Sequence, residues 1–83
     1  MYYIQNYDQG YLGNSIIFWA KDRKGYTPDI NNSHKFTEEE AKDICLNNPK
    51  KNKAWPVEYI DSNKGNQLVT DSQYLKQENI KIF

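Results

Sequence analysis

The stretch GYLGNSIIFWAKDRKGYT, residues 10–27, decides the fold because it predicts a β-hairpin at the centre of a sheet. Within it, residues 16–21 are apolar on both faces along most of their length, which is typical of a central strand that is covered on one side and partly covered on the other. Residues 22–25 form a polar turn that ends in glycine. Residues 26–30 return as a short strand, and Pro28 assigns it to the sheet edge because proline has no N–H for an inner ladder.

Segments outside the hairpin supply the remaining strands of the predicted sheet. Residues 2–6, YYIQN, begin with aromatic side chains that favour extended structure. Residues 54–61, AWPVEYID, alternate large apolar and polar side chains, with a break typical of an edge strand at Pro56. Residues 67–69 are a short candidate strand, and the tail over residues 78–83 alternates isoleucine with lysine.

The segment FTEEEA, residues 36–41, predicts where a helix begins. Thr37 is a favourable N-cap, and Glu40 follows three residues later, which is the spacing of a capping box. Beyond it, apolar residues recur at helical spacing and share one face. These residues are Ala41, Ile44 and Cys45. Asn-Asn-Pro at residues 47–49 stops the helix, so the pattern predicts a helix over about residues 38–47.

Together these elements predict an α+β fold: an antiparallel sheet of about four or five strands, with the helix at 38–47 packed on one face. The chain has 83 residues, and we expect one small domain over residues 1–83. A chain of this size buries only about 60–65% of its unfolded surface. Because each buried aromatic ring hides roughly 150–250 Å², the seven Tyr, three Phe and two Trp residues are expected to supply much of the core.

The composition restricts the classes of function. Eleven basic and eleven acidic residues cancel, whereas a dedicated nucleic-acid binder usually carries a basic excess. The single cysteine, Cys45, excludes an intramolecular disulfide and a zinc site made of cysteines. The sequence shows neither a signal peptide nor a long apolar segment, so we expect a soluble protein of the reducing cytoplasm without a membrane partner.

The sequence carries no pattern of catalytic or metal-binding residues. A reactive pair of His34 and Cys45 is disfavoured, since the negative end of the helix dipole raises the pKa of a thiol placed there. Glu38, Glu39 and Glu40 are consecutive, so their side chains point in different directions around a helix and do not converge on one metal. A glycine-rich phosphate loop is also missing. We therefore expect a protein that is not an enzyme and that uses no cofactor or metal.

Several blocks of the sequence resemble a group of small proteins encoded in phage and prophage genomes. The blocks are GNS at 13–15, FW at 18–19, GYT at 25–27 and FTEEEA at 36–41, and the resemblance covers nearly the whole chain. It attaches no catalytic role to them. It implies that the chain is a small phage accessory protein in the cytoplasm of a bacterial host. Such proteins often bind and block, and inhibitors of host antiviral systems such as anti-CRISPR proteins are among them.

Two surfaces are candidates for binding a host or phage protein. A single helix covers one face of a sheet, so aromatic side chains on the other face would form an exposed patch of the kind that marks an interaction site. Whichever of Phe18 and Trp19 faces the helix is instead part of the core. The acidic face of the helix could mimic phosphate and block a basic channel on a partner, although a solvated face is the simpler interpretation. The candidate partner-binding residues are Tyr11, Trp19, Tyr26, Glu38, Glu39 and Asp43.

An alternative function is binding of single-stranded nucleic acid. The same aromatics would stack with bases, and the lysines of KKNK, residues 50–53, would contact phosphates, although these lysines are also typical of a solvated loop. The balanced charge counts against this alternative. A homodimer is a further possibility, through an edge strand at residues 26–30 or at residues 80–83.

Overall fold

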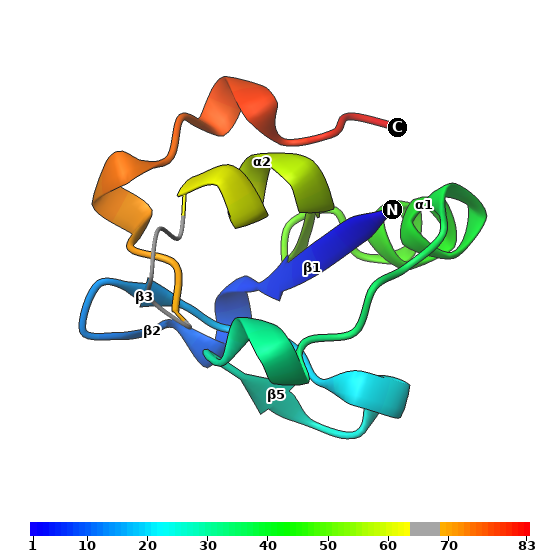
Figure 1. The fold of residues 1–83 in the computed structure, drawn as a ribbon. Coiled ribbons are helices and arrows are strands. Elements are labelled where there is room, and N and C mark those ends of the chain that lie inside the picture. The colour runs from blue at the N-terminus through cyan, green and yellow to red at the C-terminus, as the bar shows by residue number, and fades with distance from the viewer. Residues whose placement is uncertain (64–68) are drawn as a thin grey trace.

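A computed structural model describes residues 1–63 and 69–83 of the chain (Figure 1). The strands are β1 (Tyr2–Asn6), β2 (Tyr11–Leu12), β3 (Ser15–Ile16), β4 (Phe18–Trp19), β5 (Tyr26–Thr27) and β6 (Asn52–Pro56). The helices are α1 (Glu38–Asn47) and α2 (Val57–Asn63). Within the described residues, an antiparallel four-stranded sheet has the order β5-β4-β1-β6, and β2 and β3 form a second, two-stranded sheet. The predicted α+β fold class is confirmed.

Strand β1 is the centre of the main sheet. It pairs with β6 along its whole length, from Tyr2 opposite Pro56 to Asn6 opposite Asn52. On its other side Gln5 pairs with β4. The strand predicted at residues 2–6 is therefore confirmed, and its position explains why side chains on both of its faces are buried.

The central hairpin is confirmed in a shorter form. Strands β4 and β5 pair with Phe18 opposite Thr27 and Trp19 opposite Tyr26. The single strand predicted at residues 16–21 is wrong, because its first part belongs to β3 and pairs with β2 in the other sheet. The chain enters the main sheet only at Ile17, whose carbonyl accepts a hydrogen bond of 3.1 Å from the Asn6 N–H.

Helix α1 has the bounds that the sequence predicts, and its capping box is complete. The Glu40 N–H donates to Thr37 Oγ1 over 3.2 Å, and the Thr37 N–H donates to Glu40 Oε1 over 3.0 Å. Ala41 and Cys45 are buried on one helix face, against a cluster that includes Ile4 on β1. The i, i+4 spacing of these two residues places them on the same face.

A second helix replaces the end of the strand predicted at residues 54–61. The pairing of β6 with β1 ends at Pro56, opposite Tyr2, and the Val57 N–H still donates to the Met1 carbonyl over 3.0 Å. The chain turns into α2 instead, and Val57 and Ile60 face the core together at helical spacing. This segment is too short for the spacing of its apolar residues to distinguish the two-residue period of a strand from the 3.6-residue period of a helix. Its alternation therefore indicated a strand.

Both faces of the main sheet are covered, and the expectation that one face stays open is wrong. On one face, the Tyr3 and Phe18 rings pack under α2 and the C-terminal segment. On the other face, Ile4 packs against α1. Figure 1 shows α2 and the C-terminal segment on one side of β1, with α1 beside it. The sheet was expected to carry one helix, and the second helix removes the open face.

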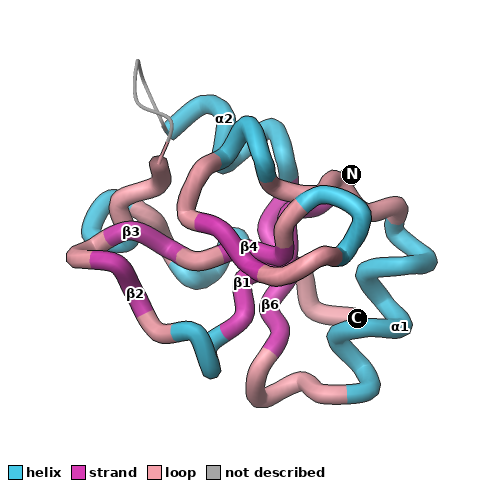
Figure 2. The backbone as a smooth tube through the Cα atoms, turned by 90° about the horizontal axis from the view of Figure 1, so that it is seen from below, coloured by secondary structure: helices cyan, strands magenta, loops and turns pink. Residues whose placement is uncertain are grey.

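The C-terminal segment wraps the molecule with little regular structure. Of the strand predicted at residues 67–69, residues 67 and 68 lie outside the described residues. The alternating tail makes one isolated bridge, in which the Lys81 N–H donates to the Ala54 carbonyl over 2.8 Å. The Phe83 ring then meets the Tyr2 ring edge-on, with centroids 5.9 Å apart. Both chain ends lie beside α1, on the opposite side of the molecule from the β2–β3 hairpin (Figure 2).

Candidate functional site

Trp19 and Tyr26 form an aromatic pair on the central hairpin. They are direct neighbours across β4 and β5, so their side chains emerge on the same face. Their ring centroids lie 4.8 Å apart with a tilt of 57°. Trp19 is half-buried and also touches the cluster under α1, whereas Tyr26 is 39% exposed. The pair therefore has one ring anchored in the core and one ring available at the surface.

Two buried amides fix the orientation of the Trp19 indole. Its N–H donates to Asn52 Oδ1 over 3.1 Å, and the same oxygen accepts from Asn6 Nδ2 over 2.9 Å. Asn6 and Asn52 are paired across β1 and β6 and are both buried. Since a buried polar atom without a partner is costly, this arrangement disfavours other rotamers of the indole.

The lysines at 50–53 do not gather around the aromatic pair. Lys51 Nζ forms an ion pair of 2.8 Å with Asp8, which raises the pKa of Lys51 through the hydrogen bond and the carboxylate charge. The Tyr26 hydroxyl adds a smaller effect of the same sign. Lys50 is exposed, and Lys53 is half-buried within β6. The ion pair with Asp8 offsets the charge of the lysine beside Tyr26.

Tyr11 lies apart from the other two predicted aromatics. Its ring, on β2, is 52% exposed, and its hydroxyl accepts a hydrogen bond of 3.4 Å from Gln5 Nε2. The Gln5 side chain lies on the face of β1 opposite to Asn6, because successive strand residues alternate. The structure therefore brings Trp19 and Tyr26 together and separates Tyr11 from them.

The acidic residues predicted on the helix are exposed on α1. Glu38 lies 4.0 Å from Lys81 Nζ and accepts a hydrogen bond of 3.5 Å from the Tyr2 hydroxyl. Glu39 and Asp43 share the outer side of the helix at i, i+4 spacing. Within residues 1–63 and 69–83, neither of these two carboxylates forms an ion pair. Exposed Lys42 lies between them in sequence and reduces the local negative charge.

Glu40, the fourth acidic residue of this region, joins α1 to the hairpin turn. Hydrogen bonds from the Thr37 backbone and hydroxyl lower the pKa of Glu40, and Arg23 contributes further. Arg23 Nη2 lies 3.0 Å from Glu40 Oε2, and the guanidinium lies 5.3 Å from the centre of the Phe36 ring. Arg23 reaches this position from a left-handed backbone conformation with φ of 57°. The Arg23–Glu40 ion pair therefore connects the acidic helix to the turn of the aromatic hairpin.

His34 and Cys45 lie in different environments. His34 Nδ1 accepts a hydrogen bond of 3.1 Å from the Asp22 N–H. Cys45 is 7% exposed, and burial raises the pKa of its thiol. Sequence reasoning placed the cause of a raised pKa in the helix dipole, whereas desolvation is the main cause in the structure. Among the described residues, no group of three His, Cys, Asp or Glu side chains could hold a metal ion.

The sequence did not single out another exposed apolar region, at the end of the molecule opposite α1. Leu12 is 65% exposed and Tyr74 is 73% exposed. The segments that carry them meet where the Ser72 N–H donates to the Asn14 carbonyl over 2.7 Å. Only Leu12 had a sequence signal, as an apolar residue within the glycine-rich turn. Nothing in the spacing around Tyr74 indicated that this residue would be exposed there.

No protein-family model, curated protein or solved structure matches this chain. In the part of the chain that the structure describes, none of the helices is both long and apolar enough to span a membrane.

Proposed function

We propose that this chain is a non-enzymatic interaction protein that binds another protein through an aromatic–acidic surface. This surface consists of Trp19 and Tyr26 on the hairpin and of Glu39 and Asp43 on α1. Both faces of the sheet are covered, so the surface is not an open sheet face. Tyr11 lies apart from the aromatic pair and is not part of this surface.

The observation that carries the proposal is the rigid aromatic pair. The Trp19 indole is fixed by Asn52 and by the core, and Tyr26 packs on it at 4.8 Å while remaining 39% exposed. Tyr and Trp dominate the energetics of protein interfaces, because a large ring with few rotatable bonds loses little entropy on binding. A tyrosine that is already held by a neighbouring indole loses still less.

The charges near this pair favour a basic partner. Glu39 and Asp43 are exposed carboxylates that form no ion pair among the described residues. The Arg23–Glu40 ion pair of 3.0 Å connects the hairpin turn to the same helix, and Ile44 of α1 packs in the cluster that includes Trp19. Complementary charge on a partner accelerates encounter and excludes wrong partners. A partner surface lined with arginine or lysine is complementary in charge to Glu39 and Asp43.

The more specific form of the proposal is an inhibitor of a bacterial antiviral defence protein. It rests on the resemblance to small phage-encoded proteins and on the acidic helix. Defence proteins that hold nucleic acid do so in basic channels, and exposed carboxylates on a small rigid protein can occupy such a channel in place of phosphates. In this form, the partner's basic channel is the surface that contacts α1.

A pull-down from bacterial lysate with the tagged chain, with and without nuclease, tests the proposal. Tyr26→Ala and Glu39→Lys are the test variants, because both side chains are exposed and their loss leaves the core intact. Tyr74→Ala and Glu78→Lys are the matched controls, since both residues are exposed and lie on the C-terminal segment. We expect a stoichiometric protein partner that survives nuclease and is lost with the test variants only. Equal retention by all four variants would exclude the aromatic–acidic surface.

The same experiment addresses binding of single-stranded nucleic acid. Recovery of nucleic acid alone, with affinity that falls steeply as salt rises, would replace the protein-binding proposal because counterion release drives such binding. The ion pair between Lys51 and Asp8 argues against this outcome, since it engages a lysine whose charge interacts with Tyr26.

A further inference from the structure

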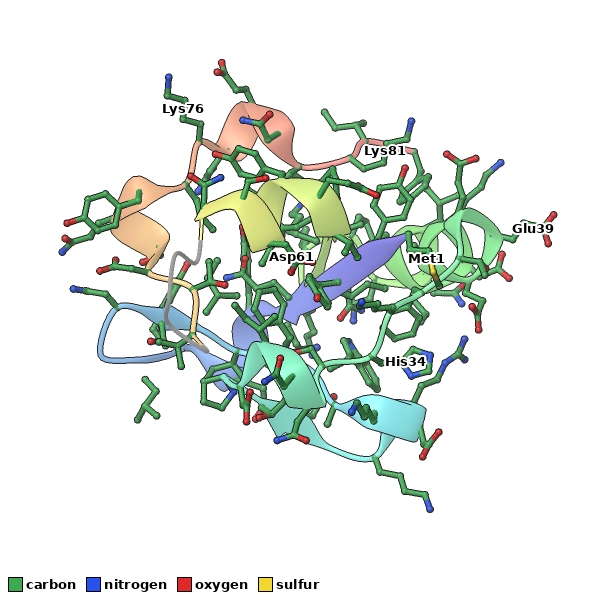
Figure 3. The ribbon with its side chains drawn as sticks, viewed as in Figure 1. Met1, His34, Glu39, Asp61, Lys76 and Lys81 are labelled. Atoms are coloured by element: carbon green, nitrogen blue, oxygen red, sulfur yellow. The ribbon has the colours of Figure 1, made fainter. Side chains whose placement is uncertain are left out.

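A polar hollow of about 410 Å³ lies on the side of the sheet that α2 covers. It is bounded by β1, by the start of the hairpin turn, by the segment before α1 and by α2. Its lining residues are Tyr3, Lys21, Ile30, Asn31, Ser33, His34, Lys35 and Asp61. Figure 3 labels two of these residues, Asp61 on α2 and His34 in the segment before α1. The volume falls within the range of about 300–1,000 Å³ that is usual for small-molecule sites.

Two lysines give the hollow an excess of positive charge. Lys21 and Lys35 are both exposed, and neither forms an ion pair within the described part of the chain. The carboxylate in the lining, Asp61, accepts a hydrogen bond of 3.0 Å from the Tyr3 hydroxyl. Since the whole chain has no net charge, two ammonium groups against one carboxylate in the lining are a local excess of positive charge.

His34 adds a hydrogen-bond donor in a fixed position. Its Nδ1 accepts from the Asp22 N–H over 3.1 Å, so the neutral ring carries its proton on Nε2. The ring also packs edge-on against Phe36, with centroids 4.5 Å apart. The His34 backbone is held as well, because its N–H donates to the Trp19 carbonyl over 2.9 Å. These contacts restrain the ring without using Nε2.

The hollow also has an apolar part. Ile30 and Tyr3 are among its lining residues and are each 2% exposed, so they close the hollow from below. Asn31 is a further lining residue, and its backbone N–H donates to Asp29 Oδ1 over 2.9 Å. An apolar floor with a few polar groups at the rim is the usual composition of a site for a small organic ligand.

We propose that this hollow binds a small organic phosphate. Lys21, Lys35 and His34 contact the phosphate group, and the organic part occupies the remainder of the hollow, toward Asp61. Two ammonium groups and one N–H donor match the charge and the acceptor oxygens of a phosphate. Asp61 can accept a hydrogen bond from a hydroxyl or amino group of the same ligand. The site is independent of the aromatic–acidic surface and is testable without a protein partner.

The test is a titration of the ¹⁵N-labelled full chain, followed by NMR, with inorganic phosphate, adenosine 5′-monophosphate and adenosine as separate probes at constant ionic strength. We expect inorganic phosphate and the nucleotide to shift the amide signals of residues 21–22 and 31–35, the nucleotide at lower concentration. Adenosine is expected to leave these signals unchanged at millimolar concentration. Shifts with the nucleotide but not with inorganic phosphate would also support the site, and they would show that the organic part is required.

Substitutions separate a built site from general charge attraction. Lys21→Gln with Lys35→Gln is expected to weaken nucleotide binding by at least about tenfold, because both charge-assisted hydrogen bonds to the phosphate are lost. The matched control replaces Lys42 and Lys76 with Gln, which removes the same charge from exposed lysines elsewhere and should leave the affinity unchanged. His34→Asn keeps an acceptor near the Asp22 N–H and removes the Nε2 donor, so it should weaken binding while the melting temperature stays close to that of the parent.

Three results would overturn the phosphate site. The first is no shift with either phosphate probe at millimolar concentration. The second is an equal loss of affinity in the two lysine pairs, which would indicate attraction by charge alone. The third is binding of adenosine as strong as that of the nucleotide, which would show that the phosphate is not recognised.

Discussion

Replacing Tyr3 with Phe should change how stability depends on pH. Tyr3 is 2% exposed, and its hydroxyl donates to Asp61 over 3.0 Å. Burial, followed by the hydrogen bond and charge of Asp61, raises the pKa of Tyr3 to about 12. The folded chain therefore holds the neutral phenol, whereas the unfolded chain ionises it near the ordinary value of 10.

The sign of the effect follows from this difference in pKa. Below about pH 10, the phenol is neutral in both states and its contribution to stability is complete. Between about pH 10 and 12, the unfolded state loses the proton first, so the contribution falls as pH rises. The full shift corresponds to roughly 2.7 kcal/mol, of which about half, roughly 1.4 kcal/mol, is lost by about pH 11. Screening of the partly buried Tyr3–Asp61 bond reduces this loss to about 1 kcal/mol.

Urea denaturation followed by tryptophan fluorescence, at about pH 8 and pH 11, measures the effect. At pH 8, Tyr3→Phe should be less stable than the parent by about 1.5–3 kcal/mol, because a buried hydrogen bond to a carboxylate is lost. At pH 11 this gap should narrow by about 1 kcal/mol. The other tyrosines and the lysines are the same in both proteins, so their effects cancel in the difference in unfolding free energy between the parent and Tyr3→Phe. Tyr74→Phe, at a 73% exposed ring, is the control and should show a constant gap. A Tyr3→Phe gap of equal size at both pH values would refute the reasoning.

Three further substitutions test other parts of the fold by the same denaturation assay. Thr37→Ala should cost about 1 kcal/mol, since it removes the helix cap that accepts from the Glu40 N–H; no loss would show that the cap is dispensable. Asn52→Ala should cost about 1–3 kcal/mol by leaving the indole N–H of Trp19 without its acceptor, with a change in fluorescence even before unfolding. Phe83→Ala should cost about 1–2 kcal/mol through lost packing of the tail, and an unchanged midpoint would mean that the tail does not hold this position.

Local signals in the sequence predicted the elements that depend on neighbouring residues. The capping box at Thr37 and Glu40, with Asn-Asn-Pro after the last turn, sets both ends of α1. The hairpin also follows from local signals, because a polar turn between two apolar segments leaves few ways for these segments to pair. The contact between Trp19 and Tyr26 follows directly from that hairpin register, so this part of the candidate site could be predicted.

Long-range pairing decided the features that the sequence did not reveal. Whether the chain beyond Pro56 is strand or helix depends on distant segments, because it is settled by the core in which Val57 and Ile60 pack together at helical spacing. The position of Tyr11 depends on which sheet takes residues 15–16, and this choice is made by pairing with β2. The polar hollow also joins side chains from separate segments, and no spacing in the sequence brings Lys21 near Asp61.

By itself, the sequence determined the helix at 38–47, the central hairpin, the aromatic pair and the exposed carboxylates, because each depends on turns, caps and periodicity within about ten to fifteen residues. Only the tertiary structure decided that α2 and the tail cover the second face of the sheet, and therefore which aromatics remain at the surface. The physical reason is that burial is a property of the assembled layers: a side chain is core or surface according to what packs on it, and here that packing comes from the far end of the chain.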